Sequence, residues 1–163
     1  MSNLSYIGLG SNMGDSNQNI IKAIQLIAAI ENVQLIQSAS FYLSKAWGKT
    51  DQNDFVNTVI EIRCEVTPEE LLQSFQQIEV NMGRLRKEKW GPRIIDIDIL
   101  TYNNQVIDKP HLKIPHPHIV ERSFVLAPLH ELNPKMSLPE LGKLENFIDN
   151  EAIRNEILKK YVL

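Results

Sequence analysis

The pattern of hydrophobic and polar residues predicts both strands and helices along the chain. Alternation predicts strands over residues 6–10, 33–42, 55–64 and 94–100. Apolar residues at helical spacing predict helices over residues 16–30, 67–82, 123–132 and 139–150. The pair Asn103-Asn104 predicts a turn that closes a hairpin into residues 105–107. Strands and helices alternate irregularly, which favours an α+β fold with a largely antiparallel sheet.

The strand over residues 94–100 carries two acidic residues on one face. Side chains two apart on a strand share a face, so Asp96 and Asp98 point together, away from the intervening isoleucines. Two carboxylates about 7 Å apart repel each other unless a cation lies between them. Mg²⁺ is held in proteins by one or two carboxylates together with substrate phosphates. The acid pair alone therefore leaves two interpretations open, a magnesium site and a solvated strand face that carries two acids.

The segment just before this strand is basic. Residues 84–93 carry five Lys or Arg residues and one Glu, whereas the whole chain has a net charge of −3. Arginine side chains bind phosphoryl oxygens through forked hydrogen bonds. A basic loop beside an acid pair thus favours a metal-bound polyphosphate, and a solvated basic loop is the alternative.

Length and composition restrict the class of protein. The 163 residues, 43% hydrophobic and 23% charged, fit one globular domain over residues 1–163. The longest apolar run is too short to span a membrane, and the N-terminus lacks the basic and apolar regions of a signal peptide. The single cysteine, Cys64, is expected in the core of a cytoplasmic protein. The pI near 5.8 argues against nucleic-acid binding.

Two other ligand motifs are disfavoured. The spacing Gly8-x-Gly10-x-x-x-Gly14 is similar to a dinucleotide fingerprint, but no acidic residue ends the next strand, so a close-packed turn is the better interpretation. The pair His116 and His118 could bind zinc, but a closed zinc site needs four donors. His118 is therefore expected to be exposed and structural.

Taken together, several segments resemble the 6-hydroxymethyl-7,8-dihydropterin pyrophosphokinase family of the folate pathway. They are, in order, residues 6–12, 54–57, 90–99, 114–118 and 121–129. The resemblance implies a ferredoxin-like α+β core. It also implies transfer of the β,γ-pyrophosphoryl unit of ATP to the hydroxymethyl oxygen of the pterin, with release of AMP. Where similar enzymes carry Thr-x-Pro-x-Gly, this chain has Ser44-Lys45-Ala46-Trp47-Gly48.

The resemblance also implies roles for individual residues. Asp96 and Asp98 match the residues that bind two Mg²⁺ ions, and Arg84 and Arg93 match catalytic arginines near the phosphates. The residues that match ATP contacts are Gln76, Glu79, Arg86, Trp90, Ile99, His116 and Arg122. The residues that match pterin contacts are Ser44, Ala46, Trp47, Phe55, Asn57, Phe124 and Asp96. We expect a monomer that binds these small molecules and neither nucleic acid nor a membrane.

The chemistry is consistent with these residues. Displacement at phosphorus needs alignment and charge neutralisation more than covalent help, so no Ser/His/Asp set is required. Asp98 is a possible acceptor for the hydroxyl proton. Two other functions remain open at this point: a glycosyltransferase that binds a sugar nucleotide through Asp-x-Asp, and an RNA-binding module that uses the basic loop and aromatic residues. Phe55 and Phe124 could also be ordinary core residues.

Overall fold

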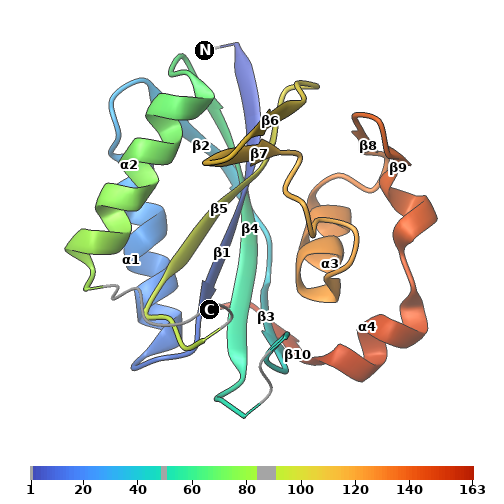
Figure 1. The fold of residues 1–163 in the computed structure, drawn as a ribbon. Helices are drawn as coiled ribbons and strands as arrows, with labels where there is room; N and C mark the ends of the chain where they lie inside the picture. Colours follow the sequence, from blue (N-terminus) through green and yellow to red (C-terminus); the bar gives the residue numbers. More distant parts are fainter. Residues whose placement is uncertain (1, 49–50, 84–90) are drawn as a thin grey trace.

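A six-stranded antiparallel sheet organises the chain (Figure 1). The computed structural model describes residues 2–48, 51–83 and 91–163. The strands of this sheet are β1 (Asn3–Ser11), β2 (Val33–Ser38), β3 (Phe41–Ser44), β4 (Phe55–Cys64), β5 (Asp96–Tyr102) and β10 (Ile157–Tyr161). Their order is β10-β3-β4-β1-β5, and β2 also pairs with β4. Every strand pairing that the structure describes is antiparallel.

The order of elements confirms the predicted ferredoxin-like α+β fold. The helices α1 (Ser16–Ala28) and α2 (Pro68–Asn81) separate the strands into the sequence β1-α1-β2-β3-β4-α2-β5, in which β2 and β3 together take the place of one strand of the ferredoxin-like order. Spatially these strands follow the order β2-β4-β1-β5, with β1 and β4 in the centre. The two central strands therefore have neighbours on both sides, and they are buried on both faces.

Helices cover both faces of the sheet. Figure 1 shows α1 and α2 on one face and α3 (Ser123–Leu132) on the other. Ile97 and Ile99 of β5 belong to the core under α1 and α2, whereas Leu100 belongs to the core under α3. Asp96 and Asp98, which alternate with the isoleucines, therefore face the side of α3. Among the described helices, none combines the length and the apolar character needed to cross a membrane.

The single strand predicted over residues 33–42 is wrong, because β2 and β3 are separate strands. Both pair with the same side of β4, one after the other along its length. Between them, Oγ1 of Thr58 donates hydrogen bonds to the carbonyl oxygens of Ala39 (3.2 Å) and Ser40 (3.0 Å). A side chain from β4 thus takes up carbonyl groups that a continuous strand would use in its ladder, and the chain bends there.

The hairpin predicted from Asn103 is also wrong. The turn forms, with Asn103 in the left-handed region at a φ of 50°. However, the chain after it enters β6 (Ile107–Lys109), which pairs with β7 (Leu112–Ile114) and not with β5. The side-chain amide of Asn103 accepts a hydrogen bond from Leu4 N at 2.8 Å, so the turn attaches to β1.

The C-terminal region departs most from its prediction. In place of a helix over residues 139–150, left-handed residues at Glu140 (φ 65°) and Gly142 (φ 95°) turn the chain between two short strands. The elements of this region are β8 (Ser137–Leu138), β9 (Gly142–Lys143), the 3₁₀ helix η1 (Leu144–Phe147) and α4 (Asn150–Glu156). The last strand, β10, then pairs with β3 in the main sheet.

A capping box forms the start of α2. Oγ1 of Thr67 accepts a hydrogen bond from Glu70 N at 3.2 Å, and the Glu70 side chain accepts one from Thr67 N at 3.1 Å. Pro68 occupies the first turn, where its missing N–H costs nothing. Hydrogen bonds of this kind satisfy amides that would otherwise have no partner within the helix.

Replacing Thr67 with alanine is expected to lower the free energy of unfolding by about 1 kcal/mol, because one helical amide loses its acceptor. Urea unfolding followed by circular dichroism measures this loss. Gln73→Ala, at an exposed position within the same helix, is the matched control and should change stability by less than about 0.5 kcal/mol. Equal effects of the two substitutions would contradict a stabilising cap.

Candidate active site

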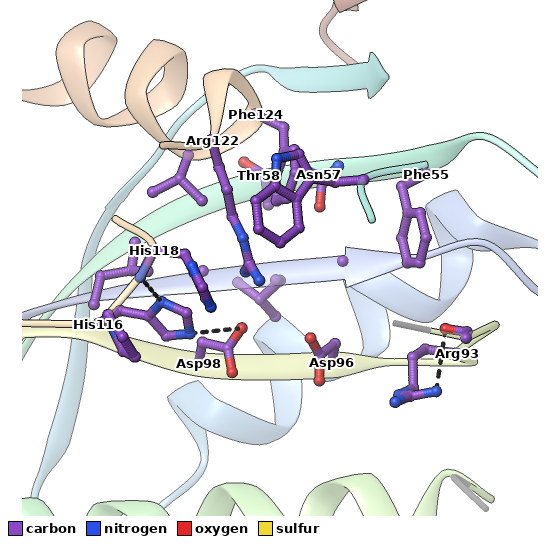
Figure 2. A pocket seen from close by; sticks show the side chains of 18 residues that line it. Phe55, Asn57, Thr58, Arg93, Asp96, Asp98, His116, His118, Arg122 and Phe124 are labelled. Carbon is purple, nitrogen blue, oxygen red and sulfur yellow. Dashed lines mark hydrogen bonds and ion pairs between the residues drawn. The ribbon is translucent and has the colours of Figure 1, made fainter. Parts of the chain in front are cut away.

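A cavity of about 280 Å³ opens between the sheet and the start of α3. Its walls come from β1, β4, β5, the segment after β7 and α3 (Figure 2). Among the predicted site residues, the cavity brings together Trp47, Phe55, Asn57, Arg93, Asp96, Asp98, His116, Arg122 and Phe124. These residues lie far apart in the sequence, so the fold itself assembles the site.

The acid pair lies on the floor of this cavity. Asp96 and Asp98 both line it, and Figure 2 shows them side by side along β5. On the opposite side of the strand, Oε2 of Glu79 accepts a hydrogen bond from Ile97 N at 2.9 Å. Glu79 is 5% exposed, so its carboxylate is a buried anchor that fixes the part of β5 between the two acids.

His116 lies beside the acid pair in a neutral state. Its Nε2 is 4.0 Å from Oδ2 of Asp98, and its Nδ1 accepts a hydrogen bond from His118 N at 3.1 Å. Burial lowers the pKa of His116 to about 4, with further lowering by Arg122 and His118. At neutral pH the imidazole is therefore an uncharged ring with its Nε2 directed at the carboxylate.

Aromatic rings surround the Arg122 guanidinium. Its Cζ lies 4.6 Å from the ring centroid of Trp47 and 5.5 Å from that of Phe124. Burial lowers the pKa of Arg122, whereas the carboxylates of Asp98 and Asp96 oppose that shift. The side chain is 7% exposed and is still positively charged at neutral pH, so it supplies a desolvated cation close to the acid pair.

Asn57 and Gly10 shape the part of the cavity next to β4. Nδ2 of Asn57 donates a hydrogen bond to Oγ of Ser44 at 3.0 Å, which fixes the orientation of the amide. Gly10 lies opposite in β1, and a Cβ atom there would be 2.7 Å from Oδ1 of Asn57. Gly8 and Gly10 are thus residues of strand β1. Of the three glycines expected in a close-packed turn, Gly14 alone has a positive φ, of 68°. Ser44 and Ala46 are buried behind the cavity wall.

A second cavity, of about 220 Å³, adjoins the first. Ile99, a predicted ATP contact, lines it together with Leu72, Ile97 and Leu112. Three residues line both cavities, namely Asp98, His116 and Pro117. Gln76 is exposed on α2 and lies outside the linings of these two cavities. The predicted residues Arg84, Arg86 and Trp90 lie outside the described part of the chain.

Two residues of the site were missed by the sequence analysis. His118 was expected to be exposed and structural, but it lines the cavity, with its ring centroid 5.1 Å from that of Trp47. Asn12 joins three segments: its Oδ1 accepts from Arg93 N at 2.8 Å, and its Nδ2 donates to Oε1 of Gln52 and to the carbonyl oxygen of Asn53, both at 3.0 Å. Asn12 follows Ser11 at the end of residues 6–12, the first segment that resembles the family. Its place in that segment was the one sign in the sequence that could have identified it.

Solved structures share this fold. A crystal structure of an HPPK-DHPS in complex with substrates superposes with a TM-score of 0.71 at 13% identity, covering 94% of this chain and 44% of that chain. The wild-type Plasmodium falciparum HPPK-DHPS with pteroate gives a TM-score of 0.70 at 16% identity, covering 89% of this chain and 41% of that chain. This chain therefore corresponds to less than half of those longer chains, and the likeness concerns the fold.

Sequence relatives are closer. The 2-amino-4-hydroxy-6-hydroxymethyldihydropteridine pyrophosphokinase of Haemophilus influenzae is 38% identical over 157 residues, 96% of this chain and 92% of the relative. The enzymes of that name from Aquifex aeolicus and Bacillus subtilis are each 42% identical, over 82% and 81% of this chain and 82% and 79% of their own. The model of the 7,8-dihydro-6-hydroxymethylpterin-pyrophosphokinase family matches residues 6–134. By this match and these identities, the chain belongs to that family.

Proposed function

We propose that the two adjoining cavities are the substrate sites of an ATP-dependent pyrophosphokinase of folate biosynthesis. The first cavity would take 6-hydroxymethyl-7,8-dihydropterin, and the second would take the nucleoside of ATP. The observation that carries this assignment is that Asp98, His116 and Pro117 line both cavities. A group transferred between two substrates must lie where their sites meet, and here that place holds Asp98, with Asp96 beside it in the first cavity.

The first cavity has the chemistry for a flat, polar heterocycle. Phe55 and Phe124 line it from β4 and α3, and aromatic faces stack on planar rings. Asn57 supplies an amide whose orientation is fixed by Ser44 and which can pair with the edge of a heterocycle. Trp47 adds a further aromatic surface. This combination supports a pterin better than a sugar, because the hydroxyl groups of a sugar need many hydrogen-bonding partners.

The residues around the acid pair fit magnesium. Asp96 and Asp98 are hard oxygen donors on one strand face, and two such carboxylates with substrate phosphates form the usual surroundings of Mg²⁺. When bound, two Mg²⁺ ions would neutralise phosphate charge and align the phosphoryl oxygens. The chain's own cations, Arg122 and Arg93, line the same cavity and would bind the remaining phosphate oxygens.

The proposed reaction is one displacement at phosphorus. The hydroxymethyl oxygen forms a bond to the β-phosphorus of ATP, and the bond from that phosphorus to the α,β-bridging oxygen breaks, so that AMP leaves. We assign the hydroxyl proton to Asp98, and its position at the border of both cavities supports this assignment. The chain contributes mainly position and charge, because the transition state of phosphoryl transfer requires little covalent help.

A turnover assay tests this function directly. AMP should form from ATP and Mg²⁺ only when 6-hydroxymethyl-7,8-dihydropterin is present, and the pterin diphosphate should form in equal amount. Hydrolysis of a sugar nucleotide would instead favour the glycosyltransferase reading. A salt-sensitive affinity for single-stranded RNA without turnover would favour the RNA-binding reading.

A pair of glycine substitutions tests the pterin site. Gly10→Ala is expected to weaken pterin binding about tenfold, because the new Cβ would displace the Asn57 amide. Gly8→Ala, two residues away in the same strand, also adds a methyl group at the wall of the first cavity. Its Cβ would meet the flexible end of Leu100 at 3.3 Å and leave the Asn57 amide in place, so this variant controls for the added volume. Fluorescence titration with the pterin compares the two. Equal affinities in both variants would remove Asn57 from the pterin site.

We propose further that the protein acts as a monomer in the cytoplasm. The aromatic, amide, carboxylate and arginine groups that the proposed reaction uses meet within this one fold, so the proposal requires no side chain from a partner subunit. Cys64 is buried and has no second cysteine to pair with in the chain, which suits a reducing compartment. Light scattering coupled to size-exclusion chromatography checks the monomer; a stable dimer would contradict it.

A further inference from the structure

We propose that Trp47 is a positioning residue for Arg122, and that its indole ring holds the guanidinium over the acid pair in readiness for the phosphates of the nucleotide. This role is distinct from the contact of Trp47 with the pterin, and it rests on the proposed function of the two cavities. It makes a residue on the pterin side of the site a determinant of nucleotide affinity.

The side chains of Trp47 and Arg122 are in close contact and are shielded from water. The guanidinium carbon of Arg122 lies 4.6 Å from the centroid of the indole, and tryptophan is the strongest of the aromatic partners for a cation. Arg122 is 7% exposed, so water screens this contact little. Cation–π attraction is largest in such desolvated surroundings. Trp47 therefore compensates part of the cost of burying the Arg122 charge.

The indole is itself held in place. The ring of His118 lies 5.1 Å from it, and Nδ1 of His118 is 2.6 Å from Oε2 of Glu121. The chain reaches Trp47 directly from the end of β3, where Lys45 N donates a hydrogen bond to Glu156 O at 3.2 Å. Contacts of the indole ring and of the backbone just before it thus fix the position of Trp47 before any substrate binds.

The orientation of Arg122 matters because of what lies beneath it. The carboxylates of Asp98 and Asp96 both act on its charge, and Figure 2 shows the guanidinium extending from the start of α3 toward β5. Phosphate oxygens bound over the acid pair would lie within the reach of that cation. An arginine held in one conformation binds more tightly than one that must first lose its rotamer freedom.

The test measures binding of a non-hydrolysable ATP analogue with Mg²⁺, in the absence of pterin, by isothermal titration calorimetry. Trp47→Leu is expected to weaken binding about tenfold, and Trp47→Phe, which retains a ring, about threefold. In an Arg122→Ala background, Trp47→Leu should change the dissociation constant less than about twofold, because the residue acts through Arg122. Trp47→Met replaces the leucine variant if that variant does not fold by circular dichroism.

Tyr161→Leu is the matched control, since the Tyr161 ring also faces a cation, Lys159 at 5.2 Å, but on β10. It should leave the affinity for the analogue unchanged. Unchanged affinity in Trp47→Leu, or an equal loss in the Arg122→Ala background, would overturn the positioning role. The proposed function has a separate readout: if the wild-type chain binds the analogue but forms no AMP with pterin, that function fails while the test of Trp47 still stands.

Discussion

Replacing Asp98 with asparagine is expected to lower kcat at least about a thousandfold, because the proposed reaction would lose one of its two metal-binding carboxylates, at the junction of the two cavities. Asp96→Asn should cause a loss of similar size. Asparagine has nearly the same shape as aspartate, so the fold is expected to remain. The measurement is the rate of AMP formation at saturating ATP, Mg²⁺ and pterin, together with a thermal unfolding curve for each variant.

Glu31→Gln is the control for these substitutions. Glu31 is exposed in the turn between α1 and β2 and lines neither cavity, so the loss of its charge should leave kcat within about twofold of the wild type. Removal of magnesium by a chelator should abolish turnover in every variant, and added Mg²⁺ should restore it in the wild type. Normal turnover in either cavity variant would remove that aspartate from the metal site.

Replacing Arg93 with alanine is expected to lower kcat about a hundredfold while changing the affinity for an ATP analogue less than about threefold. The backbone of Arg93 is fixed by Asn12, through hydrogen bonds of 2.8 Å from Arg93 N and 3.0 Å to Arg93 O. Its side chain donates to the carbonyl oxygens of Gly91 and Pro92, at 3.1 and 3.0 Å. A cation held in this way can turn to the phosphates when charge develops in the transition state.

Rapid-quench kinetics with saturating substrates, beside calorimetric binding of the analogue, separates these two effects. Arg154→Ala, on the exposed side of α4, removes an equal charge away from the cavities and serves as the control. If Arg93→Ala weakens analogue binding and leaves kcat unchanged, the arginine binds the ground state and the transition state alike. An unchanged kcat would exclude it from catalysis.

Much of the fold could be predicted because local and global preferences agree in it. Three elements have a clear hydrophobic period or a helix cap in the sequence, namely β5 with its acid pair, β4 and α2. Each of them forms close to its predicted residues. The break between β2 and β3 could not be recognised in the sequence, because the Thr58 hydroxyl that bonds to Ala39 and Ser40 there lies in another strand. The strand β10 carries Lys159 and Lys160 and has no alternating pattern, so its pairing with β3 could not be read locally.

The residues of the candidate site could likewise be predicted only in part. Asp96 and Asp98 were found because two acids on one strand face are visible in the sequence alone. Asn12 and His118 were not, because their importance comes from neighbours distant in the chain: Asn12 bonds to Arg93, 81 residues away, and His118 faces Trp47. Single polar residues of this kind have no pattern until the loops that they join are brought together.

The placement of β10 has a practical consequence for anyone who produces this protein. The family match ends at residue 134, yet the main sheet continues to Tyr161, which packs on Phe41 with ring centroids 6.0 Å apart. A protein shortened to residues 6–134 would lack β10, and the backbone hydrogen-bonding groups of β3 on that edge would have no partner strand. Exposed strand edges pair with other chains and cause aggregation. Expression boundaries, affinity tags and reporter fusions are therefore best placed beyond Tyr161, where they leave the pairing of β10 with β3 intact.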